Sequence, residues 1–360
     1  MLKNTVSLKH FSALLILLLI TPMHFIELDP LNAKNRWIFE LVQIIPGLLI
    51  IILYQYLINK YPGKNLSFIL KDNFGKSIGN LVALFYVIYF IITANSMLTH
   101  FGSFMVTDVL NETPKVVIKL LFILLVCFGI YMGTEAIARS SQILAIVSVG
   151  SVLIILFLVH LTGSTDFQRL LPVMENGLSS VLNQNNTFRL VTRYEGLVAL
   201  FLILFDTSGN KKNVNTAFLV IVAASLIRSY ISFLGVAVLG DAVYMNTWDN
   251  VSILAETVDV GLIFERISGF AYVYKIIPLF IKLSIMVYAA VKLLSYIFTV
   301  NKERVFIIPA SAVILLLSVL LAQNFVDEAI FDGTFLMGIF ETIMIAGIPL
   351  LLVIQSSLRR

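Results

Sequence analysis

The chain has 360 residues, of which 59% are hydrophobic and only 13% are charged. Soluble domains carry roughly a quarter charged residues, so this composition excludes a water-soluble catalytic domain and predicts a protein partly solvated by lipid. The formal net charge is +4, but no basic stretch is longer than two residues, which argues against a nucleic-acid-binding surface. The single cysteine and the four scattered histidines predict neither a disulfide nor a metal site.

Ten segments are long and apolar enough to cross a bilayer as helices, since about 20 mostly apolar residues span the hydrocarbon core. The predicted spans cover residues 8–28, 37–60, 79–105, 116–133, 140–162, 188–207, 215–239, 270–299, 304–323 and 335–356. The first segment has no small-residue cleavage site, so we interpret it as a span rather than a signal peptide. The sequence therefore predicts an all-α polytopic membrane protein in which residues 1–360 form a single transmembrane domain.

Lysine and arginine are distributed unevenly between the predicted loops. The loops on the side of the N-terminus collect most of them, whereas the opposite loops hold few. Because basic residues favour the cytoplasmic side, we expect both termini to be cytoplasmic in a bacterial membrane.

Two connections are long, residues 163–187 and residues 240–269, and both lie outside under this topology. Each mixes apolar and polar residues, which predicts short amphipathic helices lying on the bundle. Residues 64–74 have the same pattern on the inner side. The first long connection separates two five-helix halves, residues 8–162 and 188–358, which is the outline of an inverted repeat.

In such repeats the first helix of each half is broken near the middle of the membrane. Pro22 follows Thr21 inside the first span, and proline removes a backbone donor, so we predict a break over residues 21–24. In the sixth span Gly196 follows Tyr194 and Glu195 inside an apolar run, which predicts a second break there.

Five short segments, in register along about residues 8–358, resemble one protein family. They are YPGKNL at 61–66, NETP at 111–114, GTEAIAR at 133–139, LLPVMENGLSSVL at 170–182 and FERI at 264–267. Together they resemble the B subunits of spore germinant receptors, the GerAB-like spore germination proteins.

This resemblance implies a LeuT-type fold of the amino acid/polyamine/organocation transporter superfamily. It also implies a receptor in the spore inner membrane that contains a larger membrane A subunit and a lipoprotein C subunit, and that starts germination when a small nutrient binds. It implies no cofactor and no enzymatic activity. Members often have a glycine-rich break in the first span, whereas this chain has Thr21, Pro22 and Met23, which puts a free amino acid as ligand in doubt.

Polar and ionisable side chains inside the spans are the candidates for a ligand or ion site, because hydrocarbon disfavours them. The candidate ligand-binding residues are Thr21, Pro22, Met23, His24, Asn95, Ser96, Tyr194, Glu195, Gly196, Ala199 and Tyr288. Glu195 ranks first: it would bind a ligand ammonium, exchange a proton, or form a structural ion pair with Arg193 or Arg228. Interior packing or hydrogen bonding between helices remains the alternative for His24, Asn95, Ser96 and Ala199. We also expect Glu341 as a partner of Lys282.

A second group of polar residues is better interpreted as structural or as subunit contacts. It comprises Glu135, Arg139, Glu175, Asn176, Glu265 and Arg266. Glu135 and Arg139 are four residues apart and would face each other on a helix.

Three functions are compatible with these patterns. The first is a receptor subunit that binds a nutrient in a transporter-like cavity and signals to its partners. The alternative is a proton-coupled secondary transporter of amino acids or amines that uses Glu195. The third is a subunit that binds no nutrient and only assembles or conducts.

Overall fold

The computed structural model describes residues 7–21, 34–175, 177, 181–182, 184–204, 211–246, 250–258, 267–321 and 335–358. Within these ranges every regular element is a helix, which confirms the predicted all-α class. The α-helices are α1 (Leu8–Ile20), α2 (Arg36–Val42), α3 (Ile44–Lys60), α4 (Leu66–Phe104), α5 (Lys115–Met132), α6 (Thr134–Leu161), α7 (Gln184–Thr192), α8 (Glu195–Val198), α9 (Lys211–Leu239), α10 (Asp241–Asn246), α11 (Asn250–Glu256), α12 (Ser268–Ile297), α13 (Ile307–Leu320), α15 (Phe335–Thr342) and α16 (Ile348–Leu358). The 3-10 helices are η3 (Phe167–Leu170) and η7 (Glu303–Phe306), and the π-helices are η2 (Met105–Val109), η5 (Ala199–Leu204) and η8 (Ile343–Gly347).

Eight helices in the described part of the chain are long and apolar enough to cross a membrane. They are Arg36–Lys60, Leu66–Val109, Lys115–Met132, Thr134–Leu161, Val214–Leu239, Ser268–Ile297, Glu303–Leu320 and Leu336–Leu358. The other two predicted spans are not single long helices. The first is the shorter apolar helix α1, and the sixth is divided into α7, α8 and η5. The chain is thus a polytopic membrane protein in which two of the ten predicted spans are not continuous long helices.

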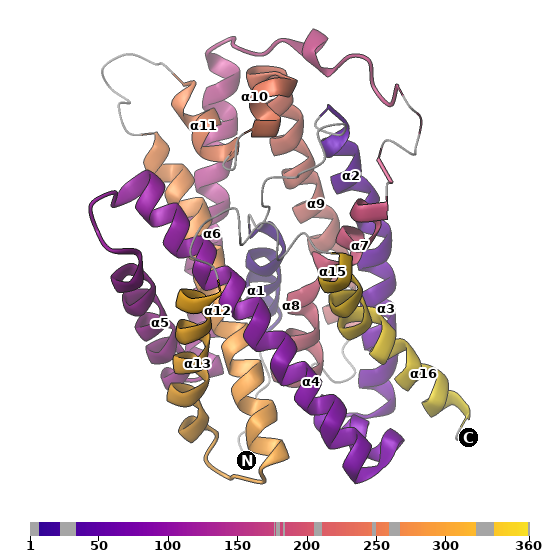
Figure 1. Cartoon of the computed structure of the whole chain (residues 1–360). Helices are drawn as coiled ribbons and strands as arrows, with labels where there is room; N and C mark the ends of the chain where they lie inside the picture. The colour runs from indigo at the N-terminus through magenta and orange to yellow at the C-terminus, as the bar shows by residue number, and fades with distance from the viewer. Residues whose placement is uncertain are drawn as a thin grey trace.

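Helix α1 lies in the interior of the bundle and the longer helices surround it (Figure 1). It packs against α6, α9 and α12, and most of its side chains are buried. Helices α4 and α12 cross the bundle and pack against one another.

The predicted amphipathic segment at 64–74 is a short helix at the start of α4, separated by a kink from the long helix that follows. The backbone of Gly75, with φ of 80°, interrupts the helix there. A Cβ added at Gly79 would lie 2.8 Å from the backbone of Lys71, so the segment before Gly75 folds back closely on α4. The other two predicted amphipathic regions contain the short elements η3, α10 and α11.

Prolines inside the spans leave backbone carbonyls that side chains from other helices satisfy. A proline has no N–H for the carbonyl four residues earlier. Pro278 in α12 leaves the carbonyl of Tyr274, which accepts from Ser148 of α6 at 3.3 Å. Pro349 in α16 leaves the carbonyl of Ile345, which accepts from the hydroxyl of Tyr54 of α3 at 2.6 Å.

A side chain from another helix also satisfies a backbone carbonyl in η8, where the π-helical turn disturbs the regular hydrogen-bond pattern. The hydroxyl of Tyr86, on α4, donates to the carbonyl of Met344 at 2.8 Å. This hydrogen bond holds α4 against the last span.

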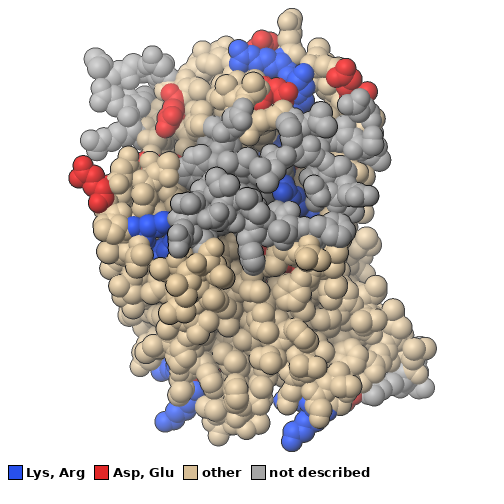
Figure 2. Space-filling view, in the orientation of Figure 1, with Lys and Arg blue, Asp and Glu red and all other residues tan. Residues whose placement is uncertain are grey.

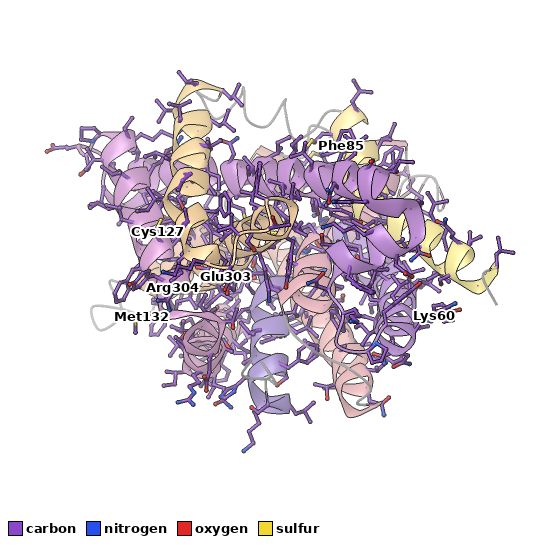
Figure 3. The ribbon with its side chains drawn as sticks, turned by 90° about the horizontal axis from the view of Figure 1, so that it is seen from below. Lys60, Phe85, Cys127, Met132, Glu303 and Arg304 are labelled. Atoms are coloured by element: carbon purple, nitrogen blue, oxygen red, sulfur yellow. The ribbon has the colours of Figure 1, made fainter. Side chains whose placement is uncertain are left out.

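One end of the bundle collects basic side chains. Lys60 donates to the carbonyl of Ser356, which joins the end of α3 to α16, and Lys71 in α4 donates to the carbonyl of Tyr296 at the end of α12, at 3.4 Å. Figure 3 views this end from below, with Lys60 on one side and Arg304 on the other. Basic groups also mark the lower end in Figure 2, whereas basic and acidic groups mix at the upper end. Because basic residues favour the cytoplasmic side, this distribution predicts that the lower end faces the cytoplasm.

We expect Tyr54→Phe to lower the free energy of unfolding by about 1–3 kcal/mol, because it removes the donor to the buried carbonyl of Ile345. Thermal unfolding of the purified protein in detergent measures this change. Tyr56→Phe, on an exposed position of the same helix, is the matched control and should change stability little. Equal effects of the two substitutions would contradict the assigned role of Tyr54.

Candidate functional site

The first site element is the end of α1, which terminates at Ile20 inside the bundle. A helix end leaves its last carbonyls without backbone donors, and it carries a partial negative charge. The carbonyl of Leu19 accepts from the guanidinium of Arg228 at 2.7 Å, and that of Ile20 accepts from the hydroxyl of Tyr274 at 3.0 Å. Thr21 is buried and its hydroxyl donates to the carbonyl of Leu17 at 2.7 Å. Pro22, Met23 and His24 lie outside the described residues.

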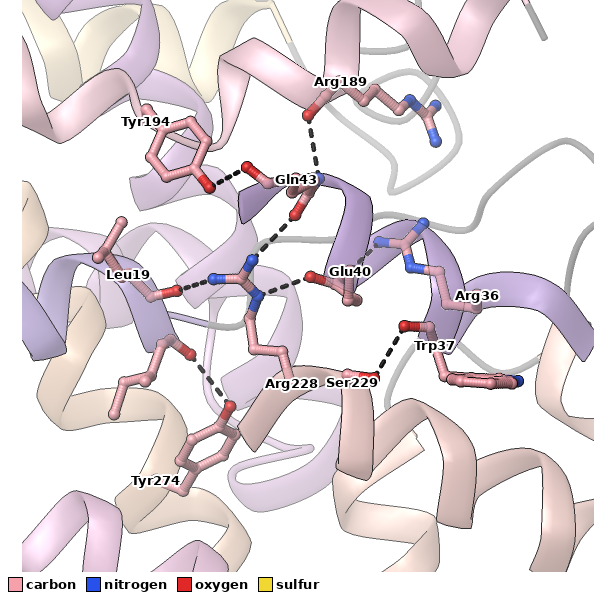
Figure 4. Close-up of polar contacts among 11 residues, drawn as sticks. Leu19, Arg36, Trp37, Glu40, Gln43, Arg189, Tyr194, Arg228, Ser229 and Tyr274 are labelled. Atoms are coloured by element: carbon pink, nitrogen blue, oxygen red, sulfur yellow. Dashed lines mark hydrogen bonds and ion pairs between the residues drawn. The ribbon is translucent and has the colours of Figure 1, made fainter. Parts of the chain in front are cut away.

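Arg228, on α9, is the centre of a buried polar cluster (Figure 4). Besides the Leu19 carbonyl it contacts Glu40 Oε2 at 2.7 Å and Gln43 Oε1 at 2.9 Å. Glu40 also pairs with Arg36 one helical turn earlier, at 3.3 Å. The side chains of Arg228 and Glu40 are only 5% and 2% exposed, so the pair lies in a medium where separated charges would be costly.

The second site element is the interruption between α7 and α8, at Arg193 and Tyr194. The phenol of Tyr194 donates to the backbone carbonyl of Gln43 at 2.5 Å. The side-chain amide of Gln43 donates to the carbonyl of Arg189 in α7 at 3.1 Å. The interruption therefore occurs where the sequence predicts one, and two hydrogen bonds hold it against the α2–α3 junction.

Gln43 links the two interruptions. It lies where α2 ends and α3 begins, and its side-chain oxygen accepts from Arg228, which also holds the end of α1. Its other two polar groups contact the α7–α8 region. One residue thus joins the end of the first predicted span to the break in the sixth.

Glycine allows the close approach that this arrangement needs. A Cβ built on Gly47 would lie 2.4 Å from the ring of Tyr194, so the ring occupies the space of the missing side chain. A Cβ on Gly196 would lie 3.0 Å from Leu18, because α8 packs closely against α1.

Glu195 begins α8 and forms a buried ion pair with Lys282 of α12. The side chain of Lys282 is 1% exposed and that of Glu195 is 7% exposed. The sequence did not identify Lys282 as the ion-pair partner of Glu195, and Arg228 pairs with Glu40 instead. The reason is that α12 packs against α8 in the interior, a contact between distant segments that hydropathy cannot show. The pairing of Glu341 with Lys282 stays a prediction.

The remaining candidate ligand-binding residues are distributed more widely. Asn95 and Ser96 are buried on α4, and the side-chain oxygen of Asn95 accepts no hydrogen bond. Ala199 is fully buried at the start of η5. Tyr288 donates to the carboxylate of Glu303 in η7 at 2.5 Å, so its hydroxyl contacts the element that precedes α13 rather than the helix interruptions.

Glu135 and Arg139 pair as predicted, at 2.5 Å in the first turns of α6. Their side chains are 76% and 70% exposed, which is compatible with the predicted structural or contact role. Glu175 is exposed, whereas Asn176, Glu265 and Arg266 lie outside the described residues. No group of potential metal ligands occurs among the residues that the structure describes.

Sequence reasoning missed Arg36, Glu40 and Gln43 as site residues. Arg36 lies directly before the predicted span at 37–60, but it is buried at the start of α2. The available signal was Glu40, an acidic residue four positions inside a predicted span, where an ionisable group is costly unless paired.

A family model described as spore germination protein matches residues 4–326 of the chain. The chain belongs to this family. It is 27% identical over 314 residues to spore germination protein KB of Bacillus subtilis (strain 168), a match that covers 86% of this chain and 82% of that protein. It is 22% identical over 267 residues to spore germination protein YndE of the same strain, covering 72% and 70% of the two chains. The resemblance seen in the short motifs is thus confirmed, and the family is not a class of enzymes.

We expect Arg228→Met to lower the free energy of unfolding by about 3–5 kcal/mol, because it removes one of the buried cations that pair with Glu40 and the donor to the Leu19 carbonyl. Arg139→Met removes an exposed ion pair of similar geometry and should cost about 1 kcal/mol or less. Thermal unfolding in detergent compares the two variants. A small effect at Arg228 would show that the cluster does not hold α1.

We expect Gly47→Ala to lower the free energy of unfolding by about 1–3 kcal/mol, since the new methyl group would collide with the ring of Tyr194. Gly150→Ala, in α6, is the matched control because a Cβ there meets no atom within 4 Å. This control should be neutral or stabilising by up to ~1 kcal/mol, since alanine favours helix. Equal thermal stability of the two variants would refute the close packing of Tyr194.

Proposed function

We propose that this chain is the membrane-embedded B-type subunit of a spore nutrient-germinant receptor. It binds a small nutrient, an amino acid or a similar compound, between the end of α1 and the α7–α8 interruption, and it signals to partner subunits. The partners are a membrane A subunit and a lipoprotein C subunit, in the spore inner membrane with both termini of this chain cytoplasmic.

The observation that supports this proposal most is the meeting of two helix interruptions inside a bundle of the spore germination family. Interrupted helices expose backbone groups to a ligand in transporter-like folds. Here Gln43 hydrogen-bonds the α7–α8 region directly and is joined to the end of α1 through Arg228. A ligand that displaces one of these contacts would move α1 relative to α7 and α8, which gives a physical route from binding to signalling.

The LeuT-type inverted repeat is part of this proposal. The order of elements supports it, because one interruption lies at the end of the first predicted span and the other in the sixth.

The direct test is germination of spores that lack this protein, in a strain from which redundant receptors have been removed. Loss of the response to at least one nutrient of a panel is the expected result. An unchanged response to every nutrient would reject the receptor role.

In the same strain, we expect Tyr194→Phe to shift the nutrient concentration for half-maximal germination roughly tenfold, because one hydrogen bond of about 1.4 kcal/mol is lost at the interruption. Tyr56→Phe is the control, and immunoblots of spore membranes check that protein levels are equal. A change in protein level without a shift in concentration would indicate a purely structural role for Tyr194.

The second candidate function is a proton-coupled transporter of amino acids or amines, which the buried carboxylate of Glu195 favours. Uptake into liposomes separates the two functions. Accumulation that collapses with the proton gradient, and that Glu195→Gln abolishes, would establish transport. If instead nutrient specificity is unaltered after substitution of Thr21, His24 and Ala199, the chain is a subunit that does not itself bind the nutrient.

A further inference from the structure

The motif YPGKNL at residues 61–66 builds the turn between α3 and α4, at the end of the bundle that collects basic side chains, called here the basic end. Gly63 has a φ of 69° within this turn, a backbone conformation that glycine adopts without strain. Asn65 caps α4, because its side-chain oxygen accepts from the amide of Phe68 at 2.9 Å. Leu66 is fully buried. The motif thus fixes where α4 begins.

The first residues of α4, 66–74, form a short helix between two glycine turns. Gly63 precedes it, and Gly75 follows it with a φ of 80°. A Cβ added at Gly75 would meet no atom within 4 Å, so no other group packs against the backbone at that point. Ile69 and Leu70 are buried and hold the short helix against the bundle. It is therefore a packed, rigid element with a hinge at each end.

Side chains tie the short helix to the ends of three spans. The side-chain amide of Asn73 donates to the phenol oxygen of Tyr61, the residue that ends α3, at 3.0 Å. The backbone carbonyl of Asn73 accepts from Gln355 of α16 at 2.7 Å. Lys71 donates to the carbonyl of Tyr296 in α12 at 3.4 Å. The short helix thus determines how the ends of α3, α12 and α16 are held relative to one another.

Helix α3 connects the basic end to the candidate functional site. Gln43 precedes its first residue and holds the α7–α8 region through its side-chain amide and its backbone carbonyl. Tyr61 follows its last residue and accepts from Asn73. A helix of 17 residues extends about 25 Å at 1.5 Å per residue. Because a helix is stiff along its axis, a shift of α3 at Gln43 also displaces Tyr61.

We propose that α3 carries the state of the α7–α8 interruption to the basic end, where the short helix 66–74, latched by Asn73, responds to it. While Tyr194 holds Gln43, α3 is fixed and Asn73 keeps the short helix against it. When that contact breaks, α3 shifts, the hydrogen bond between Asn73 and Tyr61 is lost, and the short helix turns about its glycine hinges away from the bundle. The inference rests on the proposed function only in naming a nutrient as what breaks the contact.

This movement can be measured without any nutrient, as the labelling rate of a single thiol. Cys127 is the one cysteine of the chain, so Cys127→Ser gives a background without thiols. Ser67, in the short helix, is 1% exposed, and Ser67→Cys places a thiol on the buried face with little change of shape. A charged, water-soluble maleimide reaches this thiol, in the purified protein in detergent, only when the short helix moves away. We expect slow labelling in the background protein.

Asn73→Ala should speed labelling of the Ser67→Cys reporter about tenfold, because a hydrogen bond that holds the short helix is lost. Tyr194→Phe should speed it roughly three- to tenfold, although Tyr194 contacts the opposite end of α3. The double variant should label no faster than Asn73→Ala alone, because both changes release the same latch. Asn59→Ala is the control, since it removes an exposed hydrogen bond to Gln55 on α3 and should leave the rate unchanged.

A second reporter separates this movement from a general loosening of the protein. Ser141 on α6 is fully buried, and Ser141→Cys in the same background should keep its slow labelling in every variant. The proposal is overturned if Asn73→Ala or Tyr194→Phe leaves the rate at Ser67→Cys unchanged. It is equally overturned if the two changes multiply in the double variant, or if both reporters are accelerated alike.

If Ser67→Cys does not fold, Ser356→Cys on α16, at a position 1% exposed, is the reporter for the same measurements. Its neighbour Gln355 is tied to the short helix, so release of the latch should expose it as well. These labelling rates do not depend on any germination response. Failure of the nutrient experiments and failure of this proposal are therefore distinguishable.

Discussion

A backbone carbonyl that loses its helical donor inside a membrane cannot turn to water, and this constraint organises the interior of the protein. Helix α1 ends among other helices, and Arg228 and Tyr274 satisfy its last carbonyls. The kinks at Pro278 and Pro349 leave two more carbonyls, which Ser148 and Tyr54 satisfy from neighbouring helices. At each of these places the hydrogen bond that repairs the backbone also fixes the position of one helix against another.

The charged groups follow from the same constraint. Arg228 can donate to the end of α1 because Glu40 and Gln43 also contact it, so its own charge is not isolated in the interior. Glu195 and Lys282 form a second balanced pair at the other interruption. The two pairs divide the interior polar groups into one cluster that holds α1 and one that holds α8 against α12. A change at either interruption must therefore break or move a buried ion pair, which gives discrete alternatives rather than gradual deformation.

This arrangement provides a physical basis for the proposed function. In the proposed function, the end of α1 and the α7–α8 interruption are the places where a small molecule would compete with existing contacts. Gln43 contacts the α7–α8 region directly and the end of α1 through Arg228, so a displacement on one side would move groups on the other.

Much of the architecture could be predicted from the sequence, because apolar length alone decides where helices can cross a bilayer. The eight long apolar helices, the all-α class, the interruption near Tyr194 and the pairing of Glu135 with Arg139 all follow from local composition or from spacing along one helix. The family motifs are likewise local. In contrast, the partner of Glu195 and the roles of Arg36, Glu40 and Gln43 were decided only by the tertiary structure. Lys282 and Glu195 are 87 positions apart in the numbering, and Arg228 and Glu40 are 188 apart. Hydropathy shows that such buried charges need partners, but only the packing of α8 on α12 and of α2 on α9 determines which partners come within reach.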